Sequence, residues 1–307
     1  MTEALSRPKI SIVTPSLNQG HFIEDVIRSV LFQKYPNLEY VIIDGNSKDG
    51  SADIIRKYEQ QLTYWVSEPD TGQYDAVNKG FRKTTGEIMG WINSDDKYLP
   101  WTFSIVAEIF AAFPHVEWLT TSHALQWDRE GRAVWCGGLG GYNKQAFFKG
   151  ANLPGRYWYA TGWIQQESTF WRRSLWERVN GQIDSSLKMA GDFDLWARFF
   201  HHAELYAVST PLGGFRLHGD QKTGHNMRGY IEEAEFSLLR NGGKPYGAVE
   251  SAFRRFLHAS TVRHEAILKS HLPSQASVII KHLPLFYSVK LLVWWKEGWK
   301  LEEGYIV

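Results

Sequence analysis

The stretch Gly90-Trp91-Ile92-Asn93-Ser94-Asp95-Asp96 decides the fold, because it joins an apolar segment directly to two adjacent carboxylates. In parallel α/β sheets ligands lie beyond the carboxyl ends of the strands, so a strand ending at Asp95 and Asp96 presents two anions at that rim. Neighbouring carboxylates repel each other, and a divalent cation that also binds phosphate oxygens removes the repulsion. The pair therefore predicts a metal and diphosphate site. A helix N-cap ahead of Pro100 is the alternative.

The segments around this stretch alternate between strand and helix patterns, which is typical of parallel βαβ units. The expected strands are Lys9–Thr14, Leu38–Ile43, Thr63–Ser67, Glu87–Ile92, Glu117–Thr121, Gln165–Trp171, Leu205–Val208 and Gly214–Leu217. A helix is expected from Gly191 to Phe200, and the Gly-rich run Gly137–Gly141 is interpreted as a flexible loop. Beyond His225 the chain is expected to be helical. The sequence thus predicts an α/β fold with a helical C-terminal part.

The composition excludes several classes of protein. A formal net charge of +1 over 307 residues leaves no basic surplus for a phosphate backbone, so no nucleic-acid partner is expected. The single Cys136 excludes an internal disulfide and suits a reducing compartment. The N-terminal residues MTEALSRPK contain no secretory signal, and no run of about 18 uncharged apolar residues predicts a membrane span. We therefore expect a cytoplasmic globular protein.

Five segments, in this order, resemble the family 2 glycosyltransferases. They are SIVTPSLNQGHFIEDVIRSVLFQKYPNLEYVIIDGNSKDGS, SEPDTGQYDAVNKG, TGEIMGWINSDD, QQESTFWRRSLW and GDFDLWARF. The resemblance covers roughly Pro8 to Thr223 and implies the GT-A fold, a Rossmann-like, mostly parallel sheet flanked by helices. It also implies a catalytic domain over residues 1–225, with a donor half at about 8–100 and an acceptor half at about 101–225, followed by a helical extension over 226–307.

The resemblance implies a metal site and an activity. The activity is inverting transfer of a sugar from a nucleoside diphosphate donor to an acceptor hydroxyl, with Mn²⁺ or Mg²⁺ as cofactor. Asp96 would ligate the metal, and Asp95 would hold the ribose or assist the metal, with Ser94 beside them in the donor site. Asn93 stands where the family often has Asp, so the metal would depend mainly on Asp96. A bound divalent ion stabilises the charge on the departing diphosphate.

Residues near the N-terminus match the part of the family that approaches the nucleotide. Thr14, Pro15 and Ser16 form the strand-end turn, and Asp44 matches the first acid of a pair that reads the base. A carboxylate suits the uracil N–H, so a UDP-sugar is expected, although Gly45 replaces the second acid. The alternative for Asp44 is a turn residue.

The segment Tyr74–Gly80 resembles the helix that packs beside the donor. Asp75 and Asn78 lie three residues apart on one helix face and would hold ribose or sugar hydroxyls, with Lys79 closer to phosphate. A solvated helix face is the alternative for these three residues.

The catalytic base is assigned to Asp192, which matches the second position of the family's Glu-Asp motif. Gly191 replaces the Glu, and Asp194 is interpreted as an N-terminal charge favoured by the helix dipole. Such a base accepts the proton of the acceptor hydroxyl. For Asp192 a helix cap is the competing interpretation.

Two further groups complete the predicted site. His218 occupies a strand end where some relatives place a metal ligand, and Lys222 is a suitable phosphate contact. Trp163, Gln166 and Glu167 lie where relatives line the acceptor cleft, and an indole can stack on a sugar ring. A structural histidine and a core tryptophan are the alternatives.

The C-terminal stretch Ser277–Trp299 is predicted to be an amphipathic helix carrying Lys281, Lys290, Lys296, Trp294, Trp295 and Trp299. Trp and Lys settle at the headgroup level of membranes, so one interpretation is contact with the inner face of the membrane. The other is a helix packed on the catalytic domain or on a second copy in a homo-oligomer.

Other classes of function compete with the transferase. A nucleotidyltransferase would need a basic, Gly-rich phosphate loop near the N-terminus, and a dehydrogenase would need G-x-G-x-x-G after the first strand; neither is present. A non-catalytic nucleotide- or sugar-binding module would not need Asp192. The Gln-x-x-Arg-Trp signature of processive relatives is absent from the sequence. We therefore expect single-sugar addition to a glycan or lipid-linked acceptor during assembly of lipopolysaccharide or another surface polysaccharide.

Overall fold

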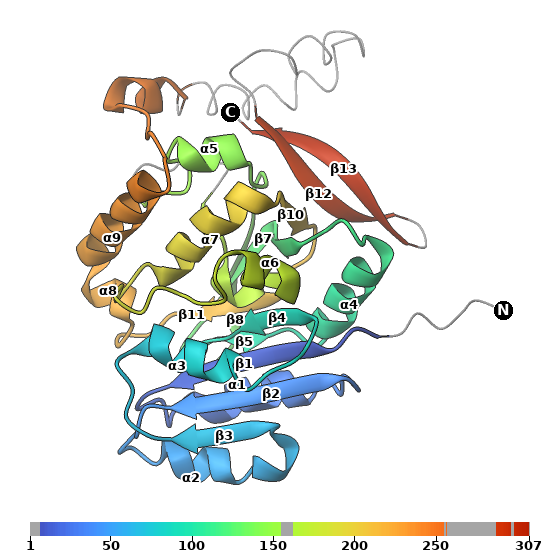
Figure 1. The fold of residues 1–307 in the computed structure, drawn as a ribbon, viewed down its shortest axis with the longest axis vertical. Coiled ribbons are helices and arrows are strands. Elements are labelled where there is room, and N and C mark those ends of the chain that lie inside the picture. Colours follow the sequence, from blue (N-terminus) through green and yellow to red (C-terminus); the bar gives the residue numbers. More distant parts are fainter. Residues whose placement is uncertain (1–6, 155–161, 255, 257–286, 296–297, 307) are drawn as a thin grey trace, which may run out of the picture.

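The computed structural model describes residues 7–154, 162–254, 256, 287–295 and 298–306 (Figure 1). Its strands are β1 (Ile10–Ser16), β2 (Leu38–Asp44), β3 (Tyr64–Ser67), β4 (Ile88–Trp91), β5 (Lys97–Tyr98), β6 (Trp118–Thr121), β7 (His123–Trp127), β8 (Ala133–Gly138), β9 (Phe170–Arg172), β10 (Leu205–Val208), β11 (Gly213–Arg216), β12 (Tyr287–Trp295) and β13 (Gly298–Ile306). Its helices are α1 (Ile23–Leu31), α2 (Ser51–Arg56), α3 (Gln73–Phe81), α4 (Thr102–Ala112), α5 (Lys144–Phe148), α6 (Arg173–Arg178), α7 (Gly191–His202), α8 (Lys222–His225) and α9 (Met227–Arg240), with 3₁₀ turns η1 (Glu59–Gln61) and η2 (Gln166–Ser168).

The described strands form two sheets. The larger has the order β13-β12-β10-β6-β9-β4-β1-β2-β3, and the smaller has the order β5-β11-β7-β8. Strands β3, β2, β1 and β4 run parallel, as do β6, β10 and β12, whereas β9 is antiparallel to both β4 and β6. The mostly parallel α/β sheet predicted from the sequence is confirmed. Seven of the eight predicted strands match observed ones to within two residues at each end.

The larger sheet lies between two layers of helices. Successive residues of a strand point to opposite faces, so neighbours in β1 and β2 enter different apolar clusters. Val13 and Val41 pack with α3, α6, α7 and α9, whereas Ile12 and Ile42 pack with α1, α2 and α4. The carboxyl ends of β1 and β4 emerge between these layers.

Five of the 14 tryptophans are buried together on one face of the sheet. They are Trp91, Trp118, Trp171, Trp176 and Trp196. The ring centroids lie 5.7 Å apart for Trp91 and Trp171, 5.9 Å for Trp91 and Trp196, and 5.6 Å for Trp118 and Trp196. Aromatic rings of this size dominate the energetics of a core. This part of the tryptophan content therefore serves the packing that supports β4.

The helical prediction for the C-terminal part holds for α9 and is wrong for residues 287–295 and 298–306. These residues form the hairpin β12–β13, and β12 extends the larger sheet by pairing in parallel with β10 (Figure 1). A short apolar run does not distinguish helix from strand, and here the free edge of β10 supplies hydrogen-bonding partners along Tyr206–Val208. The interfacial helix proposed for Ser277–Trp299 is therefore wrong at residues 287–295 and 298–299, and the rest of it lies outside the described residues.

Two smaller predictions also need correction. Gly137 and Gly138 belong to β8, so the Gly-rich run is a loop only after them. The predicted strand Gln165–Trp171 begins as the 3₁₀ turn η2 and becomes β9 at Phe170. Within the described part of the chain, no helix combines the length and apolar character needed to cross a bilayer.

Candidate active site

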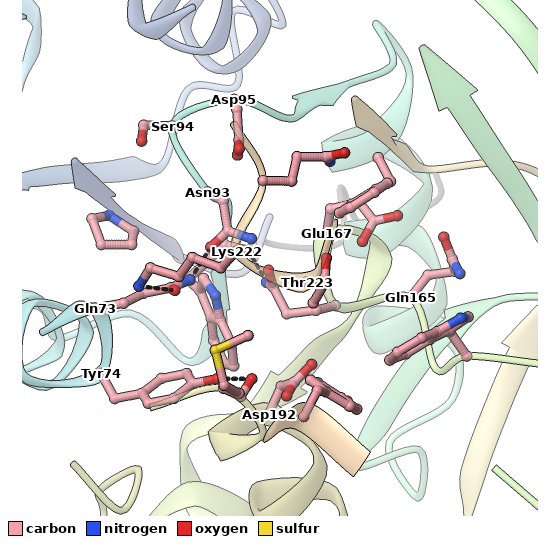
Figure 2. A pocket seen from close by; sticks show the side chains of 18 of the residues that line it. Gln73, Tyr74, Asn93, Ser94, Asp95, Gln165, Glu167, Asp192, Lys222 and Thr223 are labelled. Atoms are coloured by element: carbon pink, nitrogen blue, oxygen red, sulfur yellow. Dashed lines mark hydrogen bonds between the residues drawn. The ribbon is translucent and has the colours of Figure 1, made fainter. Parts of the chain in front are cut away.

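A pocket of about 640 Å³ opens at the carboxyl ends of β1 and β4 and continues along the smaller sheet (Figure 2). Residues from both sheets and from α3, α7, α8 and α9 line it. Among them are Pro15, Ser16, Asp70, Gln73, Tyr74, Asn93, Ser94, Asp95, Gln126, Trp135, Trp163, Gln166, Glu167, Lys188, Asp192, Phe215, Lys222 and Tyr230. The donor-half strand ends and the predicted base thus share one cavity.

Asp192 lies in the first turn of α7 and points into this cavity (Figure 2). Its Oδ1 is shielded from solvent and has no hydrogen-bond partner among the described residues. Burial raises the pKa of Asp192 to about 6, although the backbone N–H of Phe193 opposes this shift. A carboxylate with a free oxygen and a pKa near neutrality has the properties of a general base.

Gly191 allows α3 and α7 to approach closely. A Cβ at Gly191 would lie 2.7 Å from the ring of Tyr74, so no side chain fits there. Tyr74 donates its hydroxyl to the carbonyl of Met189 at 2.7 Å, which ties α3 to the segment before α7. The departure from the family motif at Gly191 therefore has a packing reason.

The segment that leads into α7 is held by Glu233 of α9. The Glu233 carboxylate accepts hydrogen bonds from the backbone N–H groups of Lys188, Met189 and Ala190 at 2.8–3.1 Å. A carboxylate near the N-terminus of a helix is favoured by the helix dipole. Glu233 thus positions Asp192, and the sequence alone gave no sign of it because the two residues are 41 positions apart.

Asp194 points away from the pocket into a buried ionic cluster. It is 1% exposed and accepts hydrogen bonds from Arg198 at 2.9 Å, from Arg240 and from Asn241. This arrangement joins α7 to the end of α9. Its role is structural, which distinguishes it from Asp192 two residues earlier.

The adjacent carboxylates Asp95 and Asp96 have different environments. Asp95 lines the pocket, whereas Asp96 is 1% exposed and accepts a hydrogen bond from the backbone N–H of Arg216 at 2.9 Å. Burial, followed by the charge of Asp95, raises the pKa of Asp96 well above its usual range. The accessible anion is thus Asp95, while the sequence had favoured Asp96 as the ligand. Trp101 occupies the N-cap of α4, so neither aspartate caps that helix.

His218 contacts Asp95 directly. Its Nε2 lies 3.0 Å from Oδ2 of Asp95, and its Nδ1 faces the backbone N–H of Asp220 at 3.3 Å. Since Nδ1 accepts this hydrogen bond, the proton of a neutral ring is on Nε2 and is donated to Asp95. In this arrangement His218 holds the carboxylate of Asp95 in place, and its role as a metal ligand stays a prediction.

Some of the residues that the sequence predicted to bind the nucleotide line one end of the pocket. Pro15 and Ser16 line it, but the Thr14 hydroxyl is buried against the hydroxyl of Tyr40 at 3.1 Å. Asp44 is fully buried and accepts hydrogen bonds from Ser47 and Ser67, so the structure gives it the alternative role of a turn residue.

Asp70 was not among the predicted residues, yet it lines this end of the pocket. A Cβ at Gly45 would lie 2.7 Å from Oδ2 of Asp70. The carboxylate of Asp70 therefore occupies the space beside Gly45, where the family's second acid was expected. Asp70 lies in the quoted segment SEPDTGQYDAVNKG, so that motif could have indicated it.

Helix α3 contributes residues other than those predicted. Asn78 bonds both its amide nitrogen and its amide oxygen to the backbone of Ile183, which is a structural role. Lys79 pairs with Glu68 and Asp75 outside the pocket lining. Asp75 also accepts a hydrogen bond from the backbone N–H of Thr71.

Gln73 is the residue of α3 that joins the pocket network. Its amide nitrogen donates to Asn93 at 2.7 Å, and its amide oxygen accepts from Lys222 at 3.3 Å (Figure 2). Asn93 in turn donates to Asp96 at 3.3 Å. The chain of hydrogen bonds links α8, α3 and the end of β4.

The predicted acceptor residues Trp163, Gln166 and Glu167 all line the pocket. The 3₁₀ turn η2 places Gln166 so that its amide donates to the carbonyl of Trp91 at 2.7 Å. Glu167 is 4% exposed, and its Oε1 has no partner in the described part of the chain. Burial raises the pKa of Glu167 to about 7, and the charges of Asp192 and Asp95 add to this effect.

Known proteins resemble the chain in sequence and in fold. Residues 11–151 match the family model described as Glycosyl transferase family 2. An uncharacterized glycosyltransferase of Rickettsia prowazekii (strain Madrid E) is 24% identical over 235 residues, which are 76% of this chain and 72% of that protein. Several further relatives match over only 94 to 105 residues, 33 to 38% of their own length.

Two solved structures share the fold. One is S. aureus TarS (residues 1–349) in complex with UDP-GlcNAc, with a TM-score of 0.56 and 16% identity over 88% of this chain and 77% of that chain. The other is a mannosyltransferase from Pyrobaculum calidifontis in complex with GDP-Man and Mn²⁺, with a TM-score of 0.54 and 17% identity over 89% of this chain and 79% of that chain.

The mostly parallel sheet, together with these structural neighbours, shows that the chain has the GT-A fold. The pocket at the carboxyl ends of its strands is where such a sheet binds ligands. The family match over residues 11–151, together with relatives named as glycosyltransferases, supports a family 2 glycosyltransferase.

Proposed function

We propose that the protein is an inverting glycosyltransferase that uses a nucleoside diphosphate sugar, with Asp192 as the general base. The observation that carries the proposal is the free, shielded Oδ1 of Asp192 in the same pocket as Asp95. The solved neighbours were captured with UDP-GlcNAc and with GDP-Man. We take a UDP-sugar as the first donor to test. The acceptor is a hydroxyl of a glycan or lipid-linked glycan in surface polysaccharide or lipopolysaccharide assembly.

In this reaction Asp192 accepts the proton of the acceptor hydroxyl. The acceptor oxygen forms a bond to the anomeric carbon on the face opposite the departing diphosphate, whose bond to that carbon breaks with its electron pair. Attack from the opposite face inverts the configuration. The products are the glycoside and the nucleoside diphosphate, and the proton on Asp192 returns to solvent.

A divalent ion fits the diphosphate end of the pocket. Mg²⁺ in such enzymes is often bound through one or two carboxylates and substrate phosphates, with water completing the shell. The described residues contain no group of three His, Cys, Asp or Glu side chains able to hold an ion without a substrate. The accessible carboxylate of Asp95, held by His218, would bind the ion together with the diphosphate. Once bound, the ion supplies positive charge that stabilises the leaving diphosphate.

The remaining residues of the pocket suit the rest of the donor. Pro15, Ser16 and Asp70 lie where the nucleoside would bind, and the ammonium groups of Lys188 and Lys222 face the same cavity. Lysine is a common point-charge contact for phosphate. A bound diphosphate would therefore meet positive charge from α8 and from the segment before α7.

We expect Asp95→Asn to abolish the dependence of donor binding on metal. The test measures the melting temperature of the protein with UDP-GlcNAc, UDP-glucose or GDP-mannose, with Mn²⁺ or with EDTA. A donor that binds the folded state at 100 times its Kd adds about 2.7 kcal/mol of stability, so the shift is measurable. Asp53→Asn, at an exposed site on α2, is the control. A shift in Asp95→Asn that still requires Mn²⁺ would contradict the assignment.

Donor binding, measured as above, and release of nucleoside diphosphate together distinguish the transferase from a non-catalytic binding module. Donor binding without release of nucleoside diphosphate, with or without a panel of acceptor glycosides, would favour the binding module. Release of nucleoside diphosphate only by wild-type protein, and its loss in Asp192→Asn, would support the transferase.

The activity should fall on the acidic side of neutrality. The base works only when deprotonated, and the pKa of Asp192 is about 6, so kcat/KM should decrease about tenfold for each pH unit below that value. The Kd of the donor is measured over the same pH range. A constant Kd shows that the decrease in kcat/KM comes from the base and not from weaker binding of the diphosphate. A flat profile between pH 7 and pH 5 would contradict the role of Asp192.

A further inference from the structure

A row of side chains crosses the smaller sheet and has no part in the reaction described above. Phe215 of β11 pairs with Gln126 of β7, and Gln126 pairs with Trp135 of β8. Residues that are directly opposite on neighbouring strands project from the same face of a sheet. All three line the pocket, so this face forms one of its walls.

The indole of Trp135 lies over a glycine. A Cβ at Gly137 would lie 2.1, 2.5 and 3.0 Å from three atoms of the six-membered ring of that indole. Gly137 has no positive φ, so the close approach of the ring is the reason for glycine here. Ala124, the cross-strand partner of Gly137, is also small. The indole of Trp135 therefore packs against Gly137 of its own strand, β8.

We call the surface formed by Trp135 and Gln126 the platform. It is accessible and presents an apolar ring next to a polar group. Trp135 is 48% exposed although it lines a pocket. Gln126, the cross-strand partner of Trp135, also lines the pocket, and a side-chain amide can provide both donors and an acceptor there. A flat apolar surface next to an amide suits a ligand with an apolar face and polar edges. A pyranose ring has this character.

The position of the platform separates it from the nucleotide. β8 is the strand of the smaller sheet farthest from β5, which directly follows Asp95 and Asp96, so Trp135 lies about 14 Å from β5 at the usual strand spacing. Ser16 and Asp70 come from the larger sheet and the loop after β3. If the diphosphate binds at Asp95, as proposed above, the wall that carries Trp135 is three strands away from it in the sheet order.

We propose that Trp135 and Gln126 form a subsite for a sugar ring of the acceptor, with the ring stacked on the indole and its hydroxyls bonded to the amide. This inference rests on the proposed function, because it assigns the acceptor side of the same pocket. It defines the acceptor as a saccharide and not merely a lipid or a small alcohol. Trp135 is a specificity residue, since it contacts the substrate away from the reacting atoms.

The test measures binding of methyl glycosides of glucose, galactose, mannose and N-acetylglucosamine, and of their disaccharides, by ligand-observed NMR in the presence of UDP and Mn²⁺. Wild-type protein should bind at least one, and Trp135→Ala should weaken that binding about tenfold, whereas Trp135→Phe should retain most of it. The Kd of UDP should change less than about twofold in both variants, because a stacking contact for one ligand leaves the other ligand's contacts in place.

A pair of glycines provides a matched control. Gly137→Ala places a methyl group against the indole and should weaken glycoside binding as Trp135→Ala does. Gly138→Ala meets open space, with no atom within 4 Å, and should leave it unchanged. The double variant Trp135→Ala/Gly137→Ala should bind no more weakly than Trp135→Ala alone, because both changes act through one ring. Melting temperatures of all variants identify any loss of folding.

Several results would overturn the proposal. One is equal glycoside binding by wild type and Trp135→Ala, and another is no glycoside binding by wild type. A third is that Trp135→Ala weakens binding of UDP and not of the glycoside, which would assign the indole to the nucleobase. Failure of the transfer reaction itself would be visible separately, since these binding measurements need no turnover.

Discussion

Replacing Asp192 by Asn should lower kcat by about 10²- to 10⁴-fold, the usual contribution of a general base. The amide has nearly the same shape as the carboxylate but cannot accept the acceptor proton. The measurement is release of nucleoside diphosphate at saturating donor and acceptor. The Kd of the donor should stay within about twofold, since only the interaction with the reacting proton is lost.

Glu167→Gln is the informative comparison for this variant. Glu167 is the other buried carboxyl of the pocket whose oxygen has no partner among the described residues, and its pKa is also raised, to about 7. If Glu167→Gln were inactive while Asp192→Asn kept kcat within a few-fold of wild type, the base would be Glu167. Loss of activity in Asp192→Asn alone would support the assignment made here.

Replacing Asp194 by Ala should lower the free energy of unfolding by about 3 kcal/mol, at the lower end of the range for breaking a buried ion pair. The change leaves Arg198 and Arg240 without the carboxylate they share, although both are partly exposed and can recover some solvation. Urea denaturation of the two proteins measures the difference.

Glu232→Ala is the control for this stability effect. It removes an ion pair of the same i,i+4 type, but Arg228 is 91% and Glu232 is 63% exposed. Exposed pairs contribute about 0 to 1 kcal/mol, so this variant should unfold close to wild type. If Asp194→Ala were as stable as Glu232→Ala, the buried cluster would not hold α7 against α9.

The sequence predicted the features that are encoded locally. Continuous apolar runs identified β1, β2 and β10, because strands buried on both faces need no polar alternation. Asp95 and Asp192 were predicted because each lies in a short motif at the end of a strand or the start of a helix, and both line the pocket. The expected parallel sheet placed only Asp95 at the rim, whereas Asp192 was assigned from the family motif.

Features that depend on distant pairing were not predictable from the sequence. Trp135 becomes part of the pocket only because β8 pairs with β7, and Glu233 matters only because α9 packs beside α7. The burial of Asp96 has the same origin, since its carboxylate accepts a hydrogen bond from the backbone N–H of Arg216, which is 120 positions away. Local chemistry shows which residues can act, and tertiary contacts decide which of them face the substrate.

The hairpin β12–β13 also bears on how the chain folds as it is synthesised. Strand β10 can pair with β6 soon after β10 leaves the ribosome, because β6 precedes it in the chain. Its other partner, β12, is made only when residues 287–295 are synthesised. Until then the N–H and C=O groups along one side of Leu205–Val208 have no strand to pair with, and such an edge is a site of misassociation. Late closure by a distant segment makes the last step of sheet assembly a long-range one, and contacts of that kind are slow to form.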